Sequence, residues 1–194
     1  MCGRLDINDH QLTRFVSEQL GLNFTTQTNH DLRPTQQVEI VAQTQEQELQ
    51  QLSSTWGIQP QWAKRPLINA QAETAATKAT FKAAFKLHRC VVPCSGWYEW
   101  KAEEGQSKKT KYLFTHPDEQ PFYMAGLYFP MTDGENRLVT LTTAPTPQCL
   151  EYHHRMPLLV RPDEVTFWLT SNAEALDPLL HAPQDIPLSI HKAS

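Results

Sequence analysis

The apolar positions near the start of the chain predict an amphipathic helix. Between Asn8 and Leu20 the apolar residues recur at helical intervals, which places them on one face. Asn8 or Asp9 can cap the first turn, and Gly21 follows the last one. The pattern predicts further helices over residues 77–86, 162–169 and 172–180.

Short apolar segments separated by turn residues predict strands through the middle of the chain. These segments span residues 38–42, 49–53, 90–93, 95–100, 112–115, 122–129 and 138–142. Strands follow one another there without alternating helices, which is typical of a meander-like α+β protein and not of a repeated βαβ unit.

Length and composition are those of one globular domain spanning residues 1–194. Apolar residues make up 40% of the chain, and no run approaches the ~20 residues of a membrane span. The first residues lack the basic and apolar regions of a secretory signal. We therefore expect a cytoplasmic protein, without contact with a membrane, whose four cysteines are reduced.

The charge distribution is uneven. The chain has a net charge of −4, which argues against a generally basic coat for nucleic acid. The segment from Lys78 to Lys111 holds eight basic and three acidic residues, so it carries +5 and leaves −9 for the rest. Such a segment suits a local track for a polyanion. A solvated helix face and loop would have the same composition.

The first candidate for chemistry is Cys2. If Met1 is removed, Cys2 presents a free α-amine and a thiol on adjacent carbons. This 1,2-aminothiol condenses with an aldehyde to an imine, which the thiol closes into a thiazolidine. With a reference pKa of about 7.7–8.0, against about 10.4 for lysine, the α-amine is neutral ~100-fold more often near pH 7. The alternative is an incidental cysteine in a disordered tail.

Three internal stretches offer further candidates. Trp56 and Trp62 lie in a loop-like stretch, where they either pack under the loop or provide a stacking platform for bases. Asn69 ends an apolar run and is either a turn former or a fixed amide. Glu99 lies among aromatic residues of a strand. It is either solvated at a sheet edge or buried, in which case its pKa would rise toward neutrality.

Histidines and cysteines allow a rival reading as a metal site. His153 and His154 precede Pro157, and a histidine is the natural proton shuttle near pH 7. Cys90 and Cys94 are spaced C-x3-C, but no second such pair exists, and adjacent histidines would point apart on a regular backbone. We therefore expect no metal and interpret Cys90, Cys94 and Cys149 as small core residues.

Four motifs together resemble the SRAP family, whose name stands for SOS response-associated peptidase. The motifs are Met1-Cys2-Gly3-Arg4, Leu67-Ile68-Asn69-Ala70-Gln71-Ala72-Glu73-Thr74, Gly96-Trp97-Tyr98-Glu99-Trp100 and His153-His154-Arg155-Met156-Pro157. The resemblance implies a single α+β domain with a curved, barrel-like, mainly antiparallel sheet and peripheral helices. It also implies a sensor of abasic sites in single-stranded DNA, including junctions with duplex, that crosslinks to the ring-opened aldehyde.

The resemblance also implies a role for each residue of the site. Cys2 would be the nucleophile, Asn69 would orient the aminothiol, Glu99 would exchange protons with the amine, and His153 would protonate the sugar ring oxygen. Contacts to DNA would come from Arg4, Pro34, Trp62, Thr142 and Arg155. No cofactor is implied, and we expect a monomer associated with the nucleoid through DNA. A lyase activity and removal of Met1, by autocatalysis or an aminopeptidase, are further implications.

The sequence departs from the family pattern at two places within these motifs. Gln71 replaces an arginine that often follows Asn-Ala, which removes one phosphate contact. His154 replaces an aspartate, so the choice of His153 over His154 rests on counting back from Met156-Pro157. Two other functions begin from the same residues: an N-terminal-cysteine amidotransferase, and a reader of single-stranded DNA that binds without a covalent bond. The amidotransferase reading lacks the glutamine-binding segments of that class.

Overall fold

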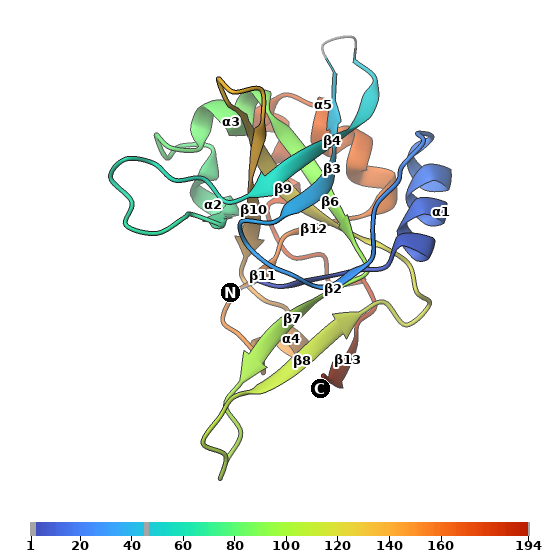
Figure 1. The fold of residues 1–194 in the computed structure, drawn as a ribbon, viewed down its shortest axis with the longest axis vertical. Helices are drawn as coiled ribbons and strands as arrows, with labels where there is room; N and C mark the ends of the chain where they lie inside the picture. Colours follow the sequence, from blue (N-terminus) through green and yellow to red (C-terminus); the bar gives the residue numbers. More distant parts are fainter. Residues whose placement is uncertain (1–2, 45–46, 194) are drawn as a thin grey trace.

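A five-stranded barrel forms the centre of the protein. The computed structural model describes residues 3–44 and 47–193. The barrel strands are β3 (Gln37–Gln43), β4 (Leu49–Trp56), β6 (Arg89–Cys94), β9 (Phe122–Pro130) and β10 (Asn136–Thr143). They are hydrogen-bonded in the order β10-β4-β3-β6-β9, and the ring closes because β9 also pairs with β10. Figure 1 shows these strands crossing one another in the upper half of the molecule.

The closure of the barrel requires one parallel pair of strands. Four of the neighbouring pairs are antiparallel, and an odd number of strands in a ring cannot alternate in direction throughout. The remaining pair, β4 with β10, is parallel, with Thr55 opposite Arg137 and Trp56 opposite Leu138. We call this pair the parallel seam.

The parallel seam is shared by two segments of the chain. After β4 ends, β5 (Asn69–Gln71) pairs with the next residues of β10, again in parallel, with Asn69 opposite Thr140. The chain between them leaves the barrel as the loop at the left of Figure 1, between β4 and α2. A bridge between Ile58 and Leu67 closes the base of this loop through two hydrogen bonds of 3.0 and 2.8 Å.

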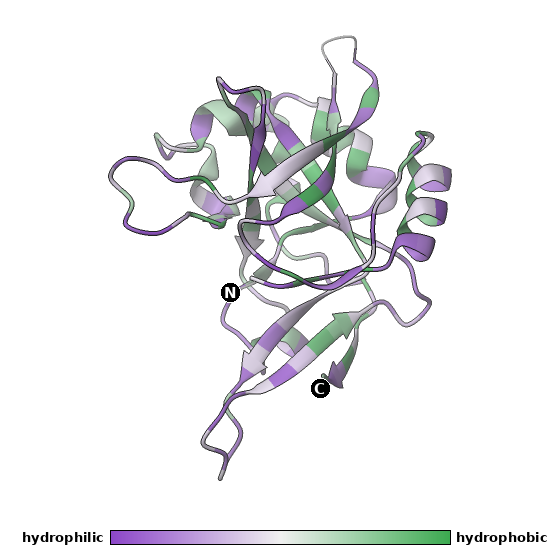
Figure 2. Cartoon of the chain, in the orientation of Figure 1, coloured by the Kyte–Doolittle hydropathy of each residue, from purple (hydrophilic) through white to green (hydrophobic). Residues whose placement is uncertain are grey.

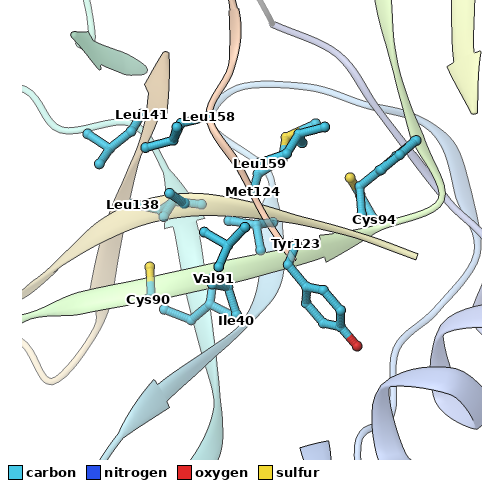
Figure 3. Packing of buried hydrophobic residues seen from close by; sticks show 14 of the residues in the cluster. Ile40, Cys90, Val91, Cys94, Tyr123, Met124, Leu138, Leu141, Leu158 and Leu159 are labelled. Atoms are coloured by element: carbon cyan, nitrogen blue, oxygen red, sulfur yellow. The ribbon is translucent and has the colours of Figure 1, made fainter. Parts of the chain in front are cut away.

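The barrel interior is filled by aliphatic and aromatic side chains. Ile40, Met124 and Leu138 come from three different strands and are fully buried. Figure 3 shows these side chains meeting between the strands, together with those of Leu158 and Leu159. Alternating side-chain direction along each strand places every second residue in this core.

A second sheet of five strands lies below the barrel. Its order is β13 (Ser189–Lys192), β8 (Thr110–Thr115), β7 (Gly96–Lys101), β1 (Leu5–Ile7) and β2 (Asn29–Leu32), all antiparallel. The chain passes from β6 into β7 at Ser95, whose hydroxyl accepts from Asn8 N–H (3.0 Å). Gly96 must be glycine there, because a Cβ would lie 2.3 Å from the Phe114 carbonyl oxygen.

Helices cover the outside of the two sheets. The first, α1 (Asp9–Leu20), begins at the Asn8 cap and ends at Gly21 in the left-handed conformation, as predicted. Figure 2 shows the hydrophilic side of α1 turned outward. The remaining elements are short: α2 (Ala72–Ala75), α3 (Lys82–Leu87), α4 (Pro147–Leu150), β11 (Met156–Pro157), β12 (Leu159–Val160), η1 (Pro162–Glu164), α5 (Val165–Thr170) and η2 (Ala173–Leu179).

The predicted α+β class with a barrel-like sheet is confirmed, and two details are corrected. The helix expected over residues 77–86 begins only at Lys82, because Phe81 N–H bonds to Lys78 O (2.9 Å) in a turn. Arg89 does not belong to a surface track of positive charge. Its side chain is buried and donates to backbone carbonyls, among them those of Phe85 (2.6 Å) and Trp168 (2.7 Å). Among the described residues, no helix is long and apolar enough to cross a membrane.

Candidate functional site

The candidate nucleophile Cys2 lies outside the described residues, which begin at Gly3. The chain that leads to it is anchored on β7. Arg4 O accepts a hydrogen bond from Tyr98 N–H (3.1 Å), and Leu5 lies opposite Trp97 in the β1–β7 ladder. The described chain therefore starts beside the strand that carries Glu99.

Glu99 is a buried carboxyl on an inner strand of the second sheet. Its exposed fraction is 3%, and β7 lies between β1 and β8, so a solvated glutamate at a sheet edge is excluded. Burial raises the pKa of Glu99, and the Lys109 ammonium opposes part of that rise. A carboxyl in this environment can hold a proton closer to neutral pH than an exposed glutamate does.

His153 lies between α4 and β11 and is partly buried. Its Nδ1 atom is 3.0 Å from both the Arg155 backbone N–H and the Arg155 carbonyl oxygen. Its own backbone N–H donates to Cys149 O (3.0 Å). Burial lowers the pKa of His153, and the positive charges of His154 and Lys109 act in the same direction. In both residues burial is the main cause of the shift, because it disfavours the charged form of the group.

Glu99 and the His153 segment are connected through two tyrosines. Glu99 lies opposite Tyr112 in the β7–β8 ladder, and the ring centroids of Tyr112 and Tyr152 are 4.8 Å apart. The negative charge of Glu99 adds to the effect of burial in raising the pKa of Cys149, and His153 is bonded to the Cys149 carbonyl. The Lys109 ammonium acts on both ionisable groups and lowers the pKa of each. The structure therefore brings these two predicted residues to one region, with Lys109 as a neighbour that the motifs did not single out.

The expectation that the adjacent histidines point apart is wrong. The rings of His153 and His154 are stacked, with centroids 4.3 Å apart and planes inclined by 28°. Regular strands turn successive side chains to opposite faces, but residues 151–155 belong to neither a helix nor a strand. The irregular backbone allows the two imidazoles to lie face to face.

Asn69 is held by a threonine across the parallel seam. Thr140 Oγ1 donates to Asn69 Oδ1 at 2.5 Å, and Thr140 is itself buried. Because the carbonyl end of the amide faces Thr140, its NH2 group is directed to the other side. This geometry favours the interpretation of Asn69 as a fixed amide in a strand. The register that selects Thr140 could not be found from the sequence.

Arg155 is fixed by an ion pair with Glu73. Its two terminal nitrogens donate to the two carboxylate oxygens of Glu73 at 3.0 and 2.7 Å, and one also donates to Thr142 O (2.6 Å). Burial alone would raise the pKa of Glu73, but the Arg155 contact outweighs it and lowers that pKa. Glu73 also accepts from Thr143 Oγ1 (3.1 Å) and Ala144 N–H (3.2 Å). It belongs to a motif quoted above, but its role there was missed.

Glu73→Ala should lower the free energy of unfolding by roughly 1–3 kcal/mol, because it leaves the largely buried Arg155 guanidinium without its carboxylate. The matched control is Glu104→Ala in the exposed β7–β8 loop, which should change stability by no more than about 0.5 kcal/mol. Urea unfolding of both variants measures the difference. Equal midpoints would show that the ion pair contributes nothing to the fold.

The residues expected to contact DNA occupy different environments. Arg4 pairs with Asp31 (2.5 Å) and lies over the Trp100 ring, with its guanidinium carbon 5.5 Å from the centroid. Pro34 is partly exposed in the turn between β2 and β3. Thr142 is buried, and its Oγ1 is directed to Ala70 O (3.4 Å), so its side chain does not face solvent.

The two tryptophans, which the sequence left as alternatives, have separate roles. Trp56 is fully buried and donates from its indole nitrogen to Ile68 O (3.0 Å), directly before Asn69. Trp62 is 68% exposed in the loop that leaves the parallel seam. Only Trp62 is therefore available for stacking on a base.

The cysteines of the described chain are core residues, as predicted. Cys90, Cys94 and Cys149 belong to the cluster of buried hydrophobic residues, and burial raises the pKa of the Cys90 thiol. No group of three or more histidine, cysteine or acidic residues within residues 3–44 and 47–193 is arranged to hold a metal ion.

Comparison with known proteins points to one family. A family model described as SOS response associated peptidase (SRAP) matches residues 1–194. The chain is 35% identical over 118 residues to abasic site processing protein YedK of Escherichia coli, covering 59% of this chain and 52% of YedK. It is 27% identical over 192 residues to abasic site processing protein YoaM of Bacillus subtilis, covering 92% and 83%.

The length of the match differs between relatives. The matched regions span about half of YedK and 58% of YoqW, another abasic site processing protein of Bacillus subtilis. Among solved structures, a Bordetella bronchiseptica protein matches over 100% of both chains with a TM-score of 0.81 and 21% identity. A Bacteroides thetaiotaomicron protein matches 85% of this chain and 78% of its own, with a TM-score of 0.71 and 22% identity. At these identities the likeness concerns the fold.

Proposed function

This chain belongs to the SRAP family, and from that membership we propose that it processes abasic sites in DNA through Cys2, once Met1 has been removed. The names of its relatives as abasic site processing proteins support the proposal. So does the place of Glu99 on β7, which pairs with the strand that leads to Cys2, while Tyr152, next to His153, packs against β8 of the same sheet.

The proposed reaction has two bond-forming stages. The neutral α-amine of Cys2 attacks the aldehyde carbon of the ring-opened sugar, and the resulting carbinolamine loses water to give an imine. The thiolate then adds to the imine carbon, and the imine nitrogen takes up a proton, which closes a thiazolidine. No oxidant, metal or cofactor takes part in this sequence.

Each fixed side chain has one task in this scheme. His153 donates a proton to the ring oxygen as the closed sugar opens, and its Nδ1–H donates to the Arg155 carbonyl oxygen, which leaves Nε2 for the substrate. Glu99 exchanges protons with the amine and the carbinolamine, which its raised pKa favours. Asn69, with its carbonyl held by Thr140, directs its NH2 group toward an oxygen of the substrate.

The observation that carries the proposal is the buried Glu99 carboxyl on the strand that pairs with β1 at the start of the described chain. The segment that holds His153 packs against the same sheet, because the Tyr152 ring contacts Tyr112 and Phe114 of β8. Single-stranded DNA is the preferred substrate in this proposal, because an aldehyde within stacked duplex must first be extruded at a cost of a few kcal/mol. The exposed Trp62 can stack on a neighbouring base.

The proposal is tested by incubating the protein with an abasic oligonucleotide and measuring the intact mass of the product. We expect a protein without Met1 that carries the DNA strand through a bond stable to heat. Abasic single strands should react faster than fully paired duplex, and an undamaged oligonucleotide should not react. Binding without a covalent product would favour the alternative of a non-covalent reader, and release of ammonia from glutamine would favour the amidotransferase.

The two histidines should differ in importance near pH 7. His153→Ala should slow crosslinking by about 10²-fold or more, because the proton donor to the ring oxygen is lost. DNA binding should change little, since a neutral imidazole adds little phosphate affinity. His154→Ala should lower the rate by much less than His153→Ala does. A crosslinking time course for both variants measures this difference, and a slower His154→Ala would assign the proton donor to His154.

A further inference from the structure

The ring of His154 is stacked on the imidazole of His153, which is the proton donor in the proposed reaction. The His153 ring is held by contacts on two sides: His154 covers one face at a centroid distance of 4.3 Å, and the Arg155 backbone binds its Nδ1 edge at 3.0 Å. His154 itself is exposed. A solvent-exposed side chain that covers an acid–base group can set both its orientation and its charge state.

We propose that His154 is a positioning residue for His153, whose ring orients the His153 imidazole and whose charge sets the pH range in which His153 carries its proton. This inference rests on the proposed function of His153 as the proton donor. It assigns to His154 a task that the motifs did not suggest, since the sequence there gave only a choice between the two histidines.

The orienting part follows from the two hydrogen-bonding states of Nδ1. In the imidazolium, Nδ1–H donates to the Arg155 carbonyl oxygen. In one neutral tautomer, Nδ1 instead accepts from the Arg155 N–H. Both bonds need the ring to stay in one plane relative to the Arg155 backbone, and the stacked His154 ring restricts rotation out of that plane. When Nε2 of the imidazolium gives up its proton, Nδ1–H still donates to the Arg155 carbonyl oxygen, so the ring position is retained.

The electrostatic part follows from the groups that face His153. On its own segment these are His154 and the Arg155 backbone. On the β7–β8 loop the facing group is Lys109. Two of these groups, Lys109 and protonated His154, are cations that disfavour a second positive charge on His153, and burial acts with them. In the proposed reaction the α-amine of Cys2 would add a third cation when protonated.

The experiment follows the His153 imidazole by NMR in DNA-free protein as pH is changed, with its signals assigned by their loss in His153→Gln. His154→Gln retains a flat side chain without charge, and His154→Asp reverses the charge. We expect the His153 midpoint to rise by about half a pH unit in His154→Gln and further in His154→Asp.

A second readout connects the pair to the reaction. The crosslinking rate should fall on the alkaline side of its pH profile. The pH of that fall should increase in the same order, from wild type to His154→Gln to His154→Asp. His10→Gln on the exposed surface of α1 is the matched control and should leave both the midpoint and the pH of that fall unchanged. His154→Ala should retain the upward shift but lower the maximal rate relative to His154→Gln, because no flat group then orients the ring.

Each result decides one part of the inference. Identical His153 midpoints in wild type, His154→Gln and His154→Asp would overturn it, since a purely structural His154 gives no ordering by charge. If the His153 midpoints follow the charge of residue 154 but the pH dependence of the crosslinking rate is the same in all three proteins, the link to the reaction is overturned. Ordered midpoints in a protein that forms no crosslink at all would refute the proposed function and leave the coupling of the two histidines supported.

Discussion

Replacing Cys2 with alanine should abolish the heat-stable crosslink while preserving formation of the imine. The variant still has a small second residue, so Met1 can be removed and the α-amine remains. Without sulfur the imine cannot close into a thiazolidine, and it should hydrolyse on heating. A denaturing gel should show no crosslink after heating, whereas treatment with borohydride before heating should trap the imine as a stable amine.

Cys94→Ala is the matched control for this prediction. Cys94 is fully buried at the end of β6, so its thiol is inaccessible to DNA. The control should form the heat-stable product at close to the wild-type rate. A heat-stable crosslink in Cys2→Ala would contradict the proposed thiazolidine, because the bond to DNA would then arise from another nucleophile.

Glu99→Gln should slow crosslinking by about 10²-fold and at the same time stabilise the fold at alkaline pH. Glutamine retains the shape of the side chain but cannot exchange a proton. Burial raises the pKa of Glu99 above its ordinary 4.5, so the folded state favours the protonated carboxyl. That contribution to stability is complete below about pH 4.5 and is lost as pH rises through the folded pKa.

The stability effect of Glu99→Gln therefore depends on pH in a defined direction. At pH 8 the ionised, buried carboxyl destabilises the wild type, and the neutral amide should raise the free energy of unfolding by on the order of 1 kcal/mol. The difference should shrink as pH falls toward 4. Urea unfolding at both pH values measures it, with Glu104→Gln as an exposed control. A destabilised Glu99→Gln at pH 8, or an unchanged crosslinking rate, would contradict the assignment.

The sequence predicted the parts of the fold that depend on local pattern. The α1 helix was found with both of its caps, because an asparagine and a glycine act within a few residues of the helix they bound. The parallel seam was not predicted, because it depends on the number of strands in the closed barrel. That number is a property of the whole fold and cannot be read from the pattern of one segment. Short strands such as β5 and β11 were missed, since two or three residues show no period.

The site was likewise predictable where it depends on local sequence and not where it depends on contacts between distant segments. The resemblance to the SRAP motifs pointed to Asn69, Glu99 and His153, but not to the partners that hold them. Thr140 lies 71 residues from Asn69, and Glu73 lies 82 residues from Arg155. Such contacts arise only when the strands take their register. The stacking of His153 on His154 could not be predicted either, because the expectation assumed a regular backbone.

The bridge at the base of the Trp62 loop makes that loop a separable unit. Ile58 and Leu67 already hold the two ends together, so the barrel does not depend on the residues between them. Doubling the length of a flexible loop with fixed ends changes its closure free energy by only about 0.6 kcal/mol. The loop that carries Trp62 can therefore be lengthened, shortened or exchanged with that of another protein while Asn69 of β5 stays opposite Thr140 of β10. Under the proposed function, the surface that would meet the substrate can then diversify independently of the residues that would perform the chemistry.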